Sequence, residues 1–183
     1  MSPSLFVTGI GTEIGKTVCS AILVKTLGAD YWKPVQSGDL HHTDTRKVAE
    51  WNGLTPAHPR FHPETYRLRT PMSPHAAAAL DGVRIELDRF QLPVTGRPLV
   101  VEGAGGLMVP LNERDLLLDL ILKLGLPVVL VSRNYLGSIN HTLLSIAQLR
   151  QAGVPLAGLI FNGPPTPTTE AFILNATEIP LLM

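Results

Sequence analysis

The residues with the clearest chemical potential form a glycine-rich segment, GIGTEIGKT, at Gly9 to Thr17. An apolar run precedes it and a helical pattern follows, the context in which backbone amides and a helix N-terminus bind phosphate. Lys16 can reach the β- and γ-phosphates of a nucleoside triphosphate, and the Thr17 hydroxyl can bind magnesium. The first glycine lies one residue earlier than in the common pattern G-x-x-x-x-G-K-T. An unliganded glycine-rich turn is the weaker alternative.

Two carboxylates could complete a magnesium site. Glu102 directly follows an apolar run and precedes Gly103-Ala104-Gly105-Gly106, so we interpret it as a metal ligand rather than a surface glutamate. Asp44 stands at an expected helix start. Its spacing alone fits a residue that complements the helix dipole and a magnesium ligand equally well.

Further polar residues lie at the ends of other expected strands. Lys33 begins the segment KPVQSG and could stabilise negative charge on a transferred group, with Ser37 beside it; a solvated lysine is the alternative. The segment 134–141 could bind a carboxylate through free amides, although a plain helix start capped by Ser138 is more common. His41 and His42 are adjacent, unlike zinc ligands on one helix face, and His75 and His141 are as easily structural as functional.

Short apolar strands alternating with helices must position these residues. Because the strands are apolar throughout, they favour a parallel sheet covered by helices, with ligands at the carboxyl ends of the strands. The segment 55–74 reads as a loop with one strand. We expect strands at 5–7, 31–33, 66–68, 99–101, 128–131 and 156–161, and helices at 16–27, 43–51 (capped by Thr43), 115–124 and 138–152.

Length and composition predict one α/β domain spanning residues 1–183. Apolar residues make up 45% of the chain and charged residues 16%, and the net charge of zero argues against binding to nucleic acid or an anionic membrane. The single cysteine, Cys19, excludes an intrachain disulfide. The apolar runs are too short to span a bilayer and the start lacks a signal-peptide pattern. We expect a soluble cytoplasmic protein.

Together these motifs resemble the dethiobiotin synthetases, over nearly the whole chain from Phe6 to about Pro180. The early first glycine also matches that family, and the lysine-proline and Glu-Gly-Ala-Gly-Gly motifs are its more specific marks. The residues that carry the resemblance are Phe6 to Gly9, Gly15 to Thr17, Lys33 to Gly38, Ser73 to His75, Val101 to Gly106, Leu136 to His141, and Phe161-Asn162.

The resemblance implies a single-domain P-loop NTPase-like fold, an ATP-dependent cyclo-ligase activity, and ATP and Mg²⁺ as cofactors. Diaminopelargonic acid and CO₂ would form a carbamate, ATP would convert it to a carbamic-phosphoric anhydride, and the second amine would close the ring of dethiobiotin with release of phosphate. It also implies a homodimer in which the loop 136–140 of one subunit helps to bind the substrate carboxylate of the other.

The resemblance also implies a role for individual residues. The expected catalytic residues are Lys33, Lys16, Thr12 and Ser37. The expected nucleotide-binding residues are Gly11, Thr12, Glu13, Ile14, Gly15, Lys16, Thr17 and Asn162, the last on the adenine edge. The expected metal ligands are Thr17, Asp44 and Glu102, and the expected substrate-binding residues are Ser37, Leu136, Gly137, Ser138 and Asn140.

Three alternatives and one departure accompany this interpretation. A partition-type ATPase switch would carry a signature lysine where Gly11 stands. An amidotransferase-type synthetase would need an added glutaminase domain. An inactive relative would not be expected to keep Lys16, Thr17, Lys33 and Glu102 together. Longer family members continue beyond the equivalent of Met183 with a segment that encloses the base, so we expect looser discrimination among nucleoside triphosphates here.

Overall fold

The computed structural model describes residues 4–182, so Met183, on which the expectation about the chain end falls, lies outside them. Its main sheet has six strands in the order β4-β2-β6-β1-β7-β8, and β3 and β5 form a smaller sheet. All of these strand pairs are parallel, which confirms the predicted fold class. The strands are β1 (Leu5–Gly9), β2 (Asp30–Trp32), β3 (Val35–Ser37), β4 (Phe61–His62), β5 (Tyr66–Leu68), β6 (Leu99–Gly106), β7 (Val128–Arg133) and β8 (Leu156–Asn162).

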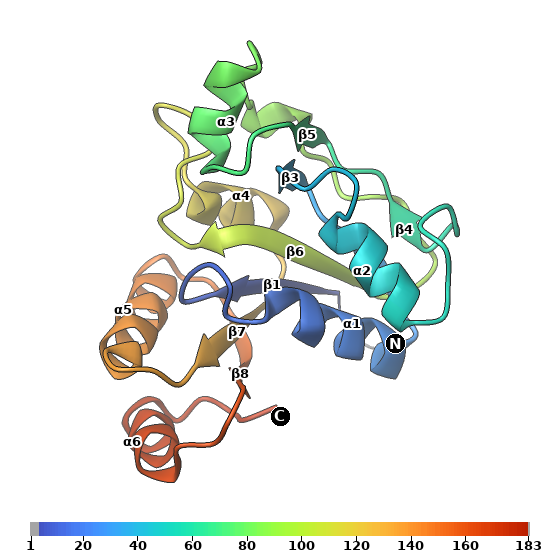
Figure 1. Ribbon diagram of the computed structural model, residues 1–183. Helices are drawn as coiled ribbons and strands as arrows, with labels where there is room; N and C mark the ends of the chain where they lie inside the picture. Colours follow the sequence, from blue (N-terminus) through green and yellow to red (C-terminus); the bar gives the residue numbers. More distant parts are fainter. Residues whose placement is uncertain (1–3, 183) are drawn as a thin grey trace.

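Helices cover both faces of the main sheet (Figure 1). Helices α1 (Lys16–Leu27) and α2 (Asp44–Trp51) pack on one face, and α4 (Leu117–Leu124) and α5 (Ser138–Gln151) on the other. Helix α6 (Pro167–Thr177) lies beside α5, and α3 (Pro74–Leu80) lies against the small sheet. The single turn η1 (Leu87–Arg89) lies against α4.

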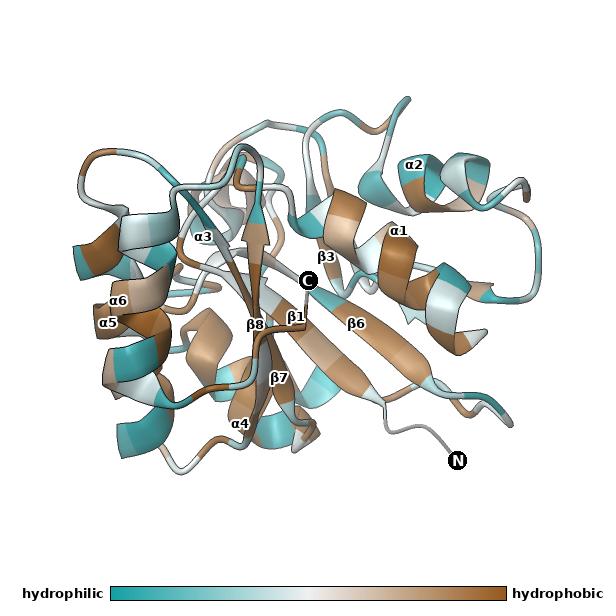
Figure 2. Cartoon of the chain, turned by 90° about the horizontal axis from the view of Figure 1, so that it is seen from below, coloured by the Kyte–Doolittle hydropathy of each residue, from teal (hydrophilic) through white to brown (hydrophobic). Residues whose placement is uncertain are grey.

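Alternate residues of each central strand face opposite helix layers. Val7 and Val129 belong to the apolar cluster with α1 and α2, whereas Phe6 and Val128 belong to the cluster with α4. This two-sided burial explains the continuous apolar strands, which stand out as brown arrows in Figure 2.

The structure confirms several predicted boundaries and corrects two. Helix α1 ends at Gly28, which adopts φ 60°, and the Thr43 hydroxyl accepts a hydrogen bond from the Arg46 amide at 3.2 Å as the cap of α2. The helix predicted from Asp115 begins at Leu117 instead, because the Asp115 amide is bonded to the Asn112 side chain in a turn. Ser138 is not the cap of α5 but its buried first residue.

Gly137 occupies the N-cap position of α5, because its φ of 101° is strained for other residues. The sequence analysis did not predict the strands β3 and β4, the helices α3 and α6, or the turn η1. It also did not predict that β6 continues through the glycines to Gly106. No helix within residues 4–182 combines the length and apolarity needed to cross a membrane.

Candidate active site

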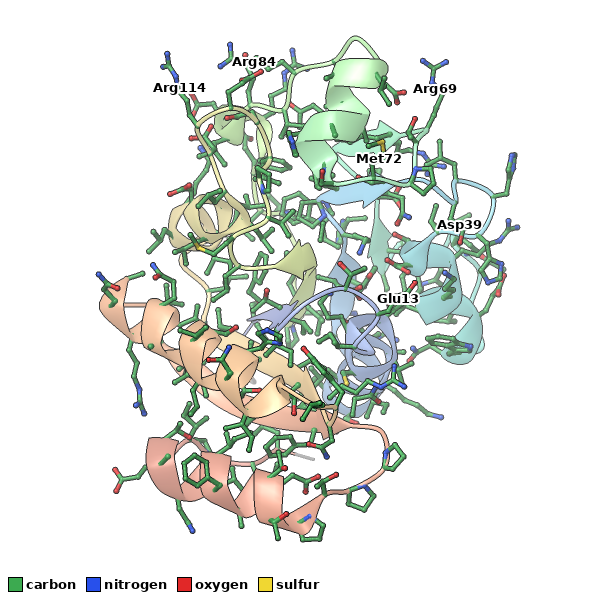
Figure 3. All side chains as sticks on the ribbon, turned by 60° about the vertical axis from the view of Figure 1, so that its left-hand side comes forward. Glu13, Asp39, Arg69, Met72, Arg84 and Arg114 are labelled. Carbon is green, nitrogen blue, oxygen red and sulfur yellow. The ribbon has the colours of Figure 1, made fainter. Side chains whose placement is uncertain are left out.

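A cavity of about 870 Å³ opens at the carboxyl ends of the strands. The phosphate loop, the ends of β2, β3 and β6, the start of α2 and the segment before α3 all line it. Figure 3 marks Glu13 on the phosphate loop and Met72 before α3, two of the lining residues. The topology therefore brings segments that are distant in sequence to one crevice, as expected for parallel α/β sheets.

The phosphate loop has the backbone that its glycines predict. Gly15 precedes α1 with φ 93°, and a Cβ there would lie 2.0 Å from Nδ2 of Asn162. A Cβ at Gly9 would lie 2.2 Å from Cδ1 of the buried Ile14, so a larger residue there would displace this side chain. The Lys16 ammonium donates to the Gly11 carbonyl oxygen at 2.7 Å.

The three predicted metal ligands meet around one buried lysine. The Lys33 ammonium lies 2.7 Å from Oδ2 of Asp44 and 3.3 Å from Oε1 of Glu102. The Thr17 hydroxyl donates to the same Oε1 at 2.9 Å. Lys33 and Glu102 are buried and the Asp44 side chain is about one-fifth exposed. Asp44 lies in this cluster and also in the first turn of α2, so its role as a metal ligand stays a prediction.

Charges in this cluster shift the pKa values of its members. Burial lowers the pKa of Lys16 to about 8, despite nearby Glu102. Burial also opposes the charge on Lys33, but Glu102 and Asp44 raise the pKa of that lysine above its usual value. For Asp44, burial is outweighed by Lys33, which lowers the pKa of the carboxyl. Lys33 and Asp44 are therefore held ionised together, whereas Lys16 loses its charge at a lower pH than an ordinary lysine.

Thr12 and Ser37 both line the cavity. Thr12 is exposed on the phosphate loop, and Ser37 closes β3. The Ser37 hydroxyl oxygen is buried and has no hydrogen-bond partner among residues 4–182. An unpartnered hydroxyl at the wall of a polar cavity is available to a bound molecule.

Two residues that organise the cluster were missed by the sequence analysis. Tyr31 is fully buried on β2, and its hydroxyl donates to Oε2 of Glu102 at 2.9 Å. Burial and the adjacent Glu102 raise the pKa of this tyrosine well above its usual value. Gln36 accepts a hydrogen bond from the Asp44 amide at 3.3 Å through Oε1 and thereby fixes the start of α2. The available signal was their position in the strands flanking Lys33.

The remaining predicted residues lie away from the main cavity. Asn162 at the end of β8 donates to the Ile14 carbonyl oxygen at 2.9 Å, so it sits directly on the phosphate loop. Leu136, Gly137 and Asn140 are exposed at the start of α5, and none of them lines the main cavity. The structure thus joins Asn162 to the loop, whereas it leaves the 136–140 segment separate within this chain.

Four of the six histidines were considered in the sequence analysis. His41 and His42 are both exposed, and His42 lines the cavity. Nδ1 of His75 lies 3.1 Å from the Ser73 hydroxyl, and Nδ1 of His141 lies 2.8 Å from the Tyr135 hydroxyl. No three His, Cys, Asp or Glu side chains within residues 4–182 are grouped closely enough to bind a metal by themselves.

A glycine-rich loop between a buried strand and a helix, followed by a lysine and a threonine and facing carboxylates from β6 and from the start of α2, defines a P-loop nucleotide-binding protein. The AAA domain family model matches residues 3–183. The chain also resembles the crystal structure of a ParA family ATPase from Chlorobium tepidum TLS, with a TM-score of 0.59 and 11% identity over 99% of this chain and 83% of that one. At this identity the likeness shows the fold alone.

Sequence relatives narrow the class further. The chain is 53% identical to the ATP-dependent dethiobiotin synthetase BioD of Christiangramia forsetii, over 98% of this chain and 85% of the relative. It is also 53% identical to the protein of the same name from Rhodopseudomonas palustris, over 89% of this chain and 77% of the relative. The chain belongs to the dethiobiotin synthetase family.

Proposed function

We propose that this chain is an ATP- and magnesium-dependent dethiobiotin synthetase, a cyclo-ligase that acts on diaminopelargonic acid and CO₂. The observation that carries the proposal is the buried Lys33, held between Asp44 and Glu102 beside a complete phosphate loop. The relatives named above, about half identical over most of the chain, support the choice of this reaction.

The donor set of the cluster fits magnesium. Thr17 supplies a hydroxyl oxygen, and Asp44 and Glu102 supply carboxylate oxygens, the hard ligands that Mg²⁺ prefers. Few protein ligands suit this ion, because it usually keeps several waters and binds substrate phosphates. We propose these three side chains as its protein ligands; when bound, the ion would neutralise charge on the transferring phosphoryl group.

The proposed reaction asks the protein mainly for positioning and charge neutralisation. An amine of diaminopelargonic acid attacks CO₂ and loses a proton, giving a carbamate. A carbamate oxygen attacks the γ-phosphorus of ATP, which releases ADP, and the second amine then attacks the carbonyl carbon and expels phosphate. We assign Lys16 and Lys33 to neutralise the phosphoryl and carbamate oxygens, and Thr12 and Ser37 to orient the carbamate.

The residues proposed to bind the nucleotide lie on or beside the phosphate loop. We propose that backbone amides from Gly11 to Thr17 cradle the phosphates at the N-terminus of α1. Asn162 would contact the adenine edge, and its place on Ile14 supports a position next to the nucleotide. A cytoplasmic location and a lack of affinity for nucleic acid stay predictions from the sequence.

We further propose a homodimer in which the 136–140 segment binds the substrate carboxylate of the partner subunit. The separation of this segment from the main cavity of its own chain supports a role in trans. Leu136 is fully exposed and Tyr135 is 44% exposed, so an apolar surface is available for contact.

Mixed dimers test this arrangement. Lys33→Met and Asn140→Ala proteins, each of low activity alone, are mixed, partially unfolded and reassociated. If sites are shared, each mixed dimer contains one site without either substitution, and activity rises toward about a quarter of native for random pairing. Activity that stays at the average of the two variants contradicts a shared site, and a monomeric mass by light scattering contradicts the dimer.

The reaction itself is tested directly. Purified protein is mixed with diaminopelargonic acid, bicarbonate, MgATP and buffer, and dethiobiotin is followed by mass spectrometry, with omission of each component as a control. We expect one ADP for each dethiobiotin. ATP hydrolysis without dethiobiotin refutes the synthetase and favours an ATPase switch or a different synthetase.

A further inference from the structure

Glu102 uses its two carboxylate oxygens for different partners. Oε1 accepts from Thr17 at 2.9 Å and lies 3.3 Å from the Lys33 ammonium. Oε2 points the other way and accepts from the Tyr31 hydroxyl at 2.9 Å, the one donor to this oxygen found within residues 4–182. The carboxylate is only 1% exposed, so water cannot readily replace a lost partner.

Tyr31 is held firmly enough to fix that orientation. It is fully buried on β2, next to β6, where Tyr31 pairs in register with Val100. Its ring also packs 6.2 Å from the ring of Phe61. The hydroxyl therefore reaches Glu102 from a rigid sheet position rather than from a loop.

We propose that Tyr31 is a positioning residue for the magnesium site: its hydroxyl holds Oε2 of Glu102 and so directs Oε1 toward Thr17 and the phosphate loop. Partners behind a metal ligand orient it, and their loss commonly weakens metal affinity about 10- to 100-fold. This inference rests on the proposed role of Glu102 as a magnesium ligand.

Loss of the hydroxyl alone has a defined consequence. In Tyr31→Phe the ring still fills its space, but Oε2 is left buried without a partner. To regain one, the carboxylate must rotate and withdraw Oε1 from Thr17 or Lys33. The substitution should therefore lower the affinity for Mg²⁺ more than it lowers kcat at saturating Mg²⁺.

Tyr66 provides a matched control. It is also buried, its ring packs 5.4 Å from that of Phe90, and its hydroxyl takes one hydrogen bond, from the Glu86 amide at 3.0 Å. It does not line the cavity. Tyr66→Phe therefore makes the same chemical change in a comparable environment without touching Glu102.

The test titrates magnesium against both variants. Calorimetry measures binding of a non-hydrolysable ATP analogue with and without Mg²⁺, and dethiobiotin formation is followed at saturating ATP across Mg²⁺ concentrations. We expect Tyr31→Phe to raise the half-saturating Mg²⁺ concentration about tenfold, with a smaller change in kcat and in binding of the analogue alone. Tyr66→Phe should lower the thermal midpoint without moving the Mg²⁺ requirement.

The outcomes separate the two proposals. A Mg²⁺ requirement within twofold of native in Tyr31→Phe overturns the positioning role, even if dethiobiotin forms normally. If the native protein forms no dethiobiotin, the proposed reaction fails, yet a weakened Mg²⁺-dependent binding of the analogue in Tyr31→Phe alone still supports the positioning role. An equal shift in both variants also overturns it, because the effect would then be a general loss of structure.

Discussion

Replacement of Lys33 by methionine tests the electrostatic centre of the site. Methionine keeps most of the buried stem but removes the ammonium between Asp44 and Glu102, at 2.7 and 3.3 Å. The buried carboxylates then lose their cation. Removing one partner of a buried ion pair costs about 3–5 kcal/mol, and the partial exposure of Asp44 places this case near the lower limit.

The expected effects on folding and catalysis follow from that value. A loss of about 3 kcal/mol is tolerable for a domain stable by about 5–15 kcal/mol, so the variant should fold. The thermal midpoint should fall by roughly 6–12 °C, from about 2–4 °C per kcal/mol for a chain of this size. The rate of dethiobiotin formation should fall by about a hundredfold or more, as for loss of a transition-state charge stabiliser.

Lys123→Met supplies the control. The Lys123 ammonium lies 3.1 Å from Oδ1 of Asp88, but the Asp88 side chain is almost fully exposed, and such pairs contribute little. Thermal unfolding by circular dichroism and dethiobiotin formation are measured for both variants. The assignment of Lys33 as a buried charge stabiliser is refuted if Lys33→Met keeps activity within fivefold of native. It is also refuted if Lys33→Met and Lys123→Met have the same thermal midpoint.

Two further predictions concern the phosphate loop. Burial lowers the pKa of Lys16 to about 8, so its side chain is charged below that pH and loses its charge above it. ATP affinity should therefore weaken by up to about tenfold per pH unit above pH 8. Calorimetry from pH 7 to 9 that shows no such change would contradict this. Gly15→Ala adds left-handed strain of about 1–2 kcal/mol and a Cβ that meets Asn162, so it should abolish measurable ATP binding. Gly53→Ala, at φ 71° with nothing within 4 Å, carries the strain alone and should bind normally.

The sequence predicted those parts of the fold that depend on local pattern. Gly28 after a periodic apolar run predicted the end of α1, and the hydroxyl of Thr43 predicted its role as a cap. Helix α6 was not predicted, because the prolines at 164, 165 and 167 are typical of loops. Pro167 instead stands in the first turn of the helix, where its missing amide hydrogen costs nothing.

The sequence could indicate the candidate site only where its motifs are contiguous. Gly15 to Thr17 form one motif, Lys33 directly follows β2, and Glu102 lies within β6. Tyr31 could not be assigned, because its partner Glu102 is 71 residues away and the contact depends on the pairing of β2 with β6. Strand order and register are properties of tertiary packing, so residues that act through them need the three-dimensional structure.

Within the chain, the charged and polar groups of the site bond to one another in contacts that a ligand must replace. Lys16 donates to the Gly11 carbonyl oxygen, and Thr17 donates to Glu102. Phosphate and magnesium would need both groups, so binding must exchange these hydrogen bonds for new ones rather than add to them. Such an exchange requires little movement of the backbone, because both side chains lie in the first turn of α1. The site therefore favours a ligand that carries both a phosphate anion and a magnesium cation. An anion alone would face the carboxylates of Asp44 and Glu102 across Lys33, and like charges repel.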